Sequence, residues 1–182
     1  MISAVLLSTT LKHRPWHRII GAILASGVVG FAIIAILQFG FGTVDGDYVA
    51  TSLALSLGTS AISLFVLGME SLLGFAGLGI GGLIMMFVAN PLSGMATGWQ
   101  WLPEPWGAFG QGLPIGASGT LIRSVAFFDG HGAGQSIITL SCWAGVGILL
   151  AALGALRSRR TADPAPDQDP APTAAPAPAP TA

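Results

Sequence analysis

Residues 19–41 read IIGAILASGVVGFAIIAILQFGF, a run of 23 positions without a charged side chain. A helix needs about 20 apolar residues to cross about 30 Å of hydrocarbon, so this run predicts a membrane-spanning helix. Three more uncharged runs follow it, at about residues 48–67, 72–89 and 136–156. The pattern predicts an all-α integral membrane protein whose membrane domain, residues 19–156, contains four transmembrane helices.

The composition of the whole chain agrees with this class. Of the 182 residues, 52% are hydrophobic and 8% are charged, and the mean hydropathy is +0.74. Soluble domains carry about 25% charged residues, so a soluble enzyme is excluded. A nucleic-acid binder needs a basic stripe for the phosphates, and this chain has none. Cys142 is the single cysteine, which excludes an internal disulfide and a cysteine-based metal site.

The cations predict how the chain is oriented. Residues 1–18 form a basic N-terminus, and a second basic cluster directly follows the fourth run. Cytoplasmic flanks are enriched in Lys and Arg, so both termini are predicted to be cytoplasmic in the plasma membrane. Arg123, in a long outer segment, is the exception. The first run is longer than the apolar part of a signal peptide and lacks a clear cleavage site, which favours an anchor over a cleaved signal.

The end of the chain differs from the rest. Residues 161–182 hold seven of the 12 prolines, interspersed with Ala and Thr. Such a sequence has little apolar surface to bury, so residues 157–182 are predicted to be a disordered cytoplasmic tail. A docking peptide for a partner protein is the alternative interpretation.

Small residues recur at helical spacing in each predicted span. They predict close helix packing, within one bundle or in a homo- or hetero-oligomer, because lipid gives apolar side chains no reason to associate. The glycines concerned are Gly30, Gly58, Gly77, Gly81 and Gly147. Gly77, Gly79 and Gly82 also match G-x-G-x-x-G, but this match lies inside an apolar span, without the strand that a dinucleotide site requires.

Residues 90–135, between the third and fourth runs, are unusually aromatic for an outer segment. Tryptophan favours the headgroup level of a membrane. Proline and glycine divide the segment into two predicted short helices, Trp106–Leu113 and Ala117–Phe128. We expect a re-entrant or interfacial helical hairpin that packs against the bundle. The dividing residues are Pro91, Pro103, Pro105, Pro114 and Gly116.

Four motifs in this segment carry a resemblance to a known family. They read NPLSG (90–94), LPEPW (102–106), GQGLPIGA (110–117) and LIRSVAFF (121–128). Together they resemble the C-terminal membrane region of ABC-2-type permeases, in the phage-infection-protein-like branch. The resemblance implies a re-entrant pair of helices before the last span. It also implies a permease-like subunit that moves an amphiphilic or lipid-like substrate, with ATP hydrolysed by a separate ATP-binding subunit.

The chain departs from that family in two respects. Such permeases usually have six spans, and this branch adds a large outer domain, whereas four spans and no outer domain are predicted here. Residues 68–74 also show no counterpart of the coupling helix that meets the ATPase. A non-transporting scaffold or regulatory protein that packs against a larger membrane complex is therefore the alternative function.

Few residues could form a site. Arg123 is a cation in an apolar context, and its expected partner is Glu104, Asp129 or a lipid phosphate; snorkelling to headgroups is the alternative. Arg123, Glu104, Asp129 and Trp106 are the candidates for a substrate path or a contact to lipid headgroups. Glu70 is either an interfacial carboxylate or a contact to a cytoplasmic partner. No Ser/His/Asp grouping, phosphate loop or pair of carboxylates rises above chance, and no complete metal-ligand set occurs, so no catalysis, metal or cofactor is predicted.

Overall fold

The computed structural model describes residues 15–96 and 98–161. Within these ranges every regular element is a helix. Four helical stretches are long and apolar enough to cross a membrane, namely Trp16–Gly40, Tyr48–Leu73, Phe75–Leu92 and Ala133–Ser158. This confirms the prediction of an all-α chain with four helices that are long and apolar enough to span a membrane. Most of the basic N-terminus and the Pro/Ala-rich part of the tail lie outside the described residues.

The first two spans are α2 (Pro15–Ala35), which continues into the π-helical turn η1 (Ile36–Gly40), and α3 (Tyr48–Leu73). The Asp47 side chain caps α3 by accepting a hydrogen bond from the Ala50 N–H at 2.7 Å. The helix was expected to end near residue 67 but continues to Leu73. It ends at Gly74, whose φ of +66° suits glycine.

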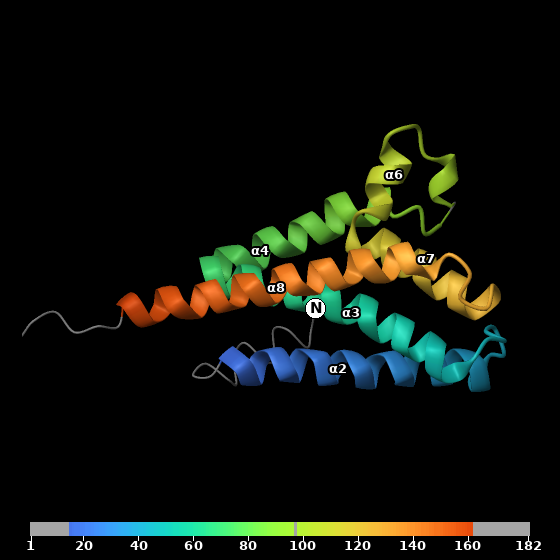
Figure 1. Cartoon of the computed structure of the whole chain (residues 1–182), viewed down its shortest axis with the longest axis horizontal. Helices are drawn as coiled ribbons and strands as arrows, with labels where there is room; N and C mark the ends of the chain where they lie inside the picture. The colour runs from blue at the N-terminus through green and yellow to red at the C-terminus, as the bar shows by residue number, and fades with distance from the viewer. Residues whose placement is uncertain (1–14, 97, 162–182) are drawn as a thin grey trace, which may run out of the picture.

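The third span combines α4 (Phe75–Leu83), the π-helical turn η2 (Ile84–Ala89) and the short α5 (Asn90–Leu92). The outer segment then contains η3 (Trp99–Trp101), α6 (Trp106–Gln111) and α7 (Pro114–Phe127), and α8 (Ala133–Thr161) is the fourth span. Consecutive spans run in opposite directions (Figure 1). The loop after η1 and the α6–α7 pair therefore share one end of the bundle, called here the loop end. The start of α2 and the end of α8 share the other, called the terminal end.

Two further predicted boundaries were wrong. Pro114 was expected to stop the first short helix, with the second beginning at Ala117. Instead Pro114 begins α7, because its fixed φ and missing N–H suit the first turn of a helix. The tail was expected to begin at residue 157, but α8 runs on to Thr161. Arginines favour the last turn of a helix, and the next proline after α8 is Pro164.

Helix α3 is the centre of the molecule and packs against α2, α4, α7 and α8. Its core contacts use small residues. A side chain at Gly30 would overlap Ser56 of α3, and one at Gly77 would overlap the Met69 backbone. Likewise, Gly58 of α3 lies against Ser118 of α7, and Gly147 of α8 lies against the Leu64 backbone. Gly81 also faces α3, at ordinary van der Waals distance. All five predicted packing glycines therefore lie at contacts within this chain.

Candidate functional site

The turn between α6 and α7 reaches far along the bundle. The indole N–H of Trp143 donates to the Gly112 carbonyl in this turn at 2.9 Å. Trp143 is ten residues beyond Ala133, the first residue of α8, which places the contact about 15 Å along that helix. Leu113, beside Gly112, is buried in a cluster with Phe65 and Met85 of the second and third spans. Helix α7 and the turn before it therefore pack against the second, third and fourth spans.

Close backbone contacts hold the α6–α7 pair in place. Added side chains would overlap the Leu92 carbonyl at Gly110 and the Gly110 carbonyl at Gly116. At the other end of α7, a Cβ at Gly46 would lie 2.7 Å from the Ala126 carbonyl oxygen. The loop between η1 and α3 therefore contacts the C-terminal end of α7. Of the predicted dividing prolines, Pro91 lies within α5 and Pro114 begins α7, whereas Pro103 and Pro105 lie between η3 and α6.

Arg123, on α7, contacts neither predicted carboxylate. Its Nη2 donates to the Met95 carbonyl at 3.0 Å and to the Gly94 carbonyl at 3.5 Å. Gly94 itself has a positive φ of +60° and packs closely on the Trp99 backbone. Arg123 therefore anchors the loop before η3 to α7, a role that the expected pairing with Glu104 or Asp129 did not anticipate.

The other outer candidates do not converge on one site. Glu104, Trp106 and Asp129 are all exposed, and Trp106 makes an edge-on ring contact with Phe109 of its own helix. The imidazole Nδ1 of His131 lies 2.8 Å from the Phe128 carbonyl, in the tight turn that contains Asp129. In the part of the chain that the structure describes, no three potential ligands group into a metal site.

Glu70 forms an ion pair at the terminal end. Its carboxylate accepts a hydrogen bond from Arg18 Nη2 at 2.7 Å, and the two side chains are 17% and 15% exposed. Arg18 lies in the first turn of α2 and Glu70 lies near the end of α3, so the pair joins these two helices. Glu70 was predicted as an interfacial carboxylate or a partner contact; here it has a partner within the chain.

Removing one member of this pair leaves the other partly buried without its counter-charge. We expect Glu70→Gln to lower the free energy of unfolding by about 1–3 kcal/mol, between the values for exposed and buried pairs. Thermal unfolding of the purified protein measures this. The reversed pair Arg18→Glu/Glu70→Arg should recover most of the loss. Additive losses in a double-mutant cycle would show that the two charges are not coupled.

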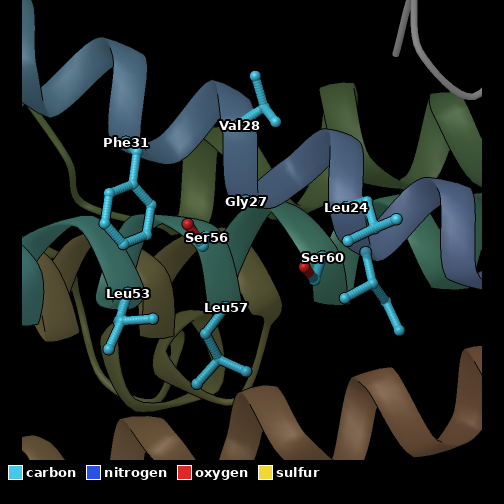
Figure 2. Close-up of a pocket in the computed structure, with 9 residues that line it drawn as sticks. Leu24, Gly27, Val28, Phe31, Leu53, Ser56, Leu57 and Ser60 are labelled. Atoms are coloured by element: carbon cyan, nitrogen blue, oxygen red, sulfur yellow. The ribbon is translucent and has the colours of Figure 1, made fainter.

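Two cavities are relevant to function, and the larger is a groove between α2 and α3. It has a volume of about 600 Å³ and is almost entirely apolar. In Figure 2, the Phe31 ring extends from α2 towards α3, and Leu53 and Leu57 lie on the α3 side. Gly27 lines the groove and has no atom within 4 Å of where its Cβ would be. Because glycine adds no side chain there, the space between the helices stays open.

Two serines give this apolar surface a slight polarity. The Ser56 hydroxyl donates to the Ser52 carbonyl at 2.7 Å, so its proton is already used. The Ser60 hydroxyl makes no hydrogen bond with any residue in the described ranges. Such a groove suits an alkyl chain far better than a charged ligand.

A second cavity of about 410 Å³ lies at the loop end, where η3, α6, α7 and α8 meet. Its polar lining includes Gln111, Thr120, Gln135 and Ser136. None of these four was among the predicted site residues, which are charged or aromatic side chains. The signal that could have predicted this cavity is the pair of neutral amides at 111 and 135, because the chain has few polar side chains.

Comparisons with known proteins complete this description. No family model matches the chain. A search of curated proteins and a search of solved structures also found no match.

Proposed function

We propose that the chain is a permease-like membrane subunit of an ABC-2-type export system, without an ATPase of its own. The observation that carries the proposal is the apolar groove between α2 and α3. The residues that line the groove extend from Ile23 to Phe31 on α2 and from Leu53 to Ser60 on α3. A groove of this length suits the alkyl part of an amphiphile. The groove would form one wall of a path whose other wall comes from a second subunit or a second copy.

The α6–α7 pair has the role of a re-entrant hairpin in this proposal. In its turn, Leu113 is buried against the second and third spans, and Gly112 bonds to Trp143 and lines the second cavity. This supports the role, because irregular backbone at membrane depth is tolerated only where protein covers it or where it lines a cavity. The charges support an orientation with the terminal end in the cytoplasm of the plasma membrane. Among the residues that the structure describes, Arg18 of α2 and Arg157 of α8 lie near the terminal end, whereas Arg123 of α7 is the one Lys or Arg near the loop end.

Filling the groove tests the transport role. Gly27→Phe places a ring in the groove at a position with room for it, so the fold should persist. We expect ATP-dependent movement of a fluorescently labelled short-chain phospholipid, in inside-out vesicles that contain the chain and its co-purifying ATPase, to fall about tenfold or more. The measurement is the rate at which the label becomes protected from an impermeant quencher.

Gly145→Phe is the matched control, because Gly145 also has no atom within 4 Å and lies on α8, outside the groove. It should leave the rate unchanged. If Gly27→Phe and Gly145→Phe transport alike, the groove is not part of the path. If no ATPase co-purifies in mild detergent and no ATP-dependent movement occurs, the export function itself fails.

A non-transporting scaffold is the second candidate. The observation that favours it is the apolar surface on α4 and η2, where Phe75, Leu83 and Phe87 are each more than half exposed. The open Gly79 on the same helix would let another helix approach closely. Co-purification of a larger membrane complex without an ATPase would favour this function.

A further inference from the structure

The cavity at the loop end has a lining unlike the rest of this molecule. Four separate elements contribute to it: Trp99 from η3, Gln111 from α6, Thr120 from α7, and Gln135 and Ser136 from α8. None of the residues that line it carries a formal charge. Its volume of about 410 Å³ lies within the usual range for small-molecule sites.

Part of the lining is held in position. The Gln111 amide nitrogen donates to the Ser93 carbonyl at 3.3 Å, and its carbonyl oxygen accepts from the Thr120 hydroxyl at 2.6 Å. These two bonds fix the orientation of the amide between α6 and α7. One Gln111 N–H, one Gln111 lone pair and the Thr120 lone pairs remain available to a ligand.

Two other polar side chains in the lining have no hydrogen-bond partner among the described residues. The Gln135 side-chain amide makes no hydrogen bond with the residues that the structure describes. The Ser136 hydroxyl also has no such partner within the same ranges, although Ser136 is only 5% exposed. Gln135 is exposed, and the Ser136 hydroxyl is not among the solvent-inaccessible groups without a partner, so both are open to water or a ligand in the cavity.

We propose that this cavity binds an uncharged, hydroxyl-rich ring, that is, a neutral glycosyl group. A sugar hydroxyl both donates and accepts, which matches the amides of Gln111 and Gln135 and the hydroxyls of Thr120 and Ser136. The C–H face of the ring is apolar and can pack on an indole such as that of Trp99. A phosphate or carboxylate only accepts hydrogen bonds and would enter a cavity whose lining offers no cation.

A sugar binds at this cavity whether or not the chain exports anything, so the test is a binding measurement. The full chain is reconstituted in phosphatidylcholine nanodiscs, because sugar-based detergents would compete for the cavity. Methyl glucoside is the free-sugar probe, and a monoglucosyl diacylglycerol in the nanodisc is the lipid-borne probe. Calorimetric titration measures the first, and displacement of bound glucoside measures the second.

We expect glucoside to bind with a Kd of about 1–10 mM, the weak affinity typical of a single ring in a half-open site. Gln135→Leu should weaken binding about tenfold, which equals about 1.4 kcal/mol. Gln100→Leu is the matched control, because Gln100 is exposed in the same outer segment and does not line the cavity. Trp99→Leu should also weaken binding, whereas Trp101→Leu, at an 83% exposed position outside the cavity, should not.

The outcomes separate the alternatives. Displacement of glucoside by the glycolipid would identify a lipid-borne headgroup as a ligand, whereas failure to displace would restrict the cavity to free sugars. The proposal would be overturned if glucoside did not bind at about 50 mM and the glycolipid did not bind either. Equal weakening by Gln135→Leu and Gln100→Leu would do the same, as would tighter binding of inorganic phosphate than of glucoside. Thermal unfolding of each variant establishes that the fold is intact.

Discussion

Gly147→Ala is expected to destabilise the protein, although the same substitution two residues earlier should not. An added Cβ at Gly147 would lie 2.6 Å from the Leu64 carbonyl oxygen and 2.6 Å from the Phe65 amide nitrogen of α3. Both are backbone atoms and cannot move aside, so α8 must shift away from the central helix. Overpacking of this kind lowers the free energy of unfolding by about 1–3 kcal/mol.

Gly145→Ala is the control for this prediction, because no atom lies within 4 Å of its added Cβ. Alanine is favoured over glycine inside a helix by about 0.8–1.0 kcal/mol in soluble hosts, so this variant should be neutral or slightly more stable. Thermal unfolding in one detergent measures both. If the two variants unfold at the same temperature, α8 does not contact α3 at Gly147.

Gly58→Ala is expected to separate α7 from α3, and Ser118→Gly should reverse the effect. The added Cβ at Gly58 would overlap the Ser118 hydroxyl and lie 2.7 Å from the Ser118 Cβ. Once both of those atoms are removed, the nearest remaining atom is the Ser118 Cα, at an ordinary 3.6 Å. We expect Gly58→Ala to lower the free energy of unfolding by about 1–3 kcal/mol.

In the double variant, an alanine gained on α3 offsets a glycine introduced on α7, so its stability should approach that of the original chain. Ser118 is buried and its hydroxyl makes no hydrogen bond within the described ranges, so removing it breaks none. The coupling between the two sites in a double-mutant cycle is the quantity measured. Zero coupling would mean that α7 does not pack on α3 as described.

The spans could be predicted because the bilayer imposes a length on them. Four apolar runs correspond to four helices, and the errors lie at their ends. Pro114 begins α7 instead of ending the preceding helix, since proline fits either position and only the tertiary path decides. The second span continues past residue 67 to Leu73, and its last turns include Glu70, which pairs with Arg18, 52 residues away in sequence. No local pattern reveals that partner.

Contacts within the candidate sites were much less predictable. From the sequence, Arg123 was expected to pair with a carboxylate, because opposite charges attract over a distance. In the folded chain it satisfies backbone carbonyls of a tight loop. The two cavities are lined mainly by neutral side chains from different elements, such as Gly27 with Ser60 and Gln111 with Gln135. Which neutral residues meet depends on how the helices cross, and the sequence pattern does not contain that information.

The central claim is that the chain has four spans and that the α6–α7 pair returns to the side from which it enters. Thiol labelling in intact cells tests this most directly, in a Cys142→Ser background because Cys142 is exposed. Single cysteines replace Leu73, Glu104 and Asp129, all of which are exposed in the structure. An impermeant maleimide should label positions 104 and 129 from outside, and position 73 only after permeabilisation. Labelling of 104 and 129 from opposite sides of the membrane would contradict the account.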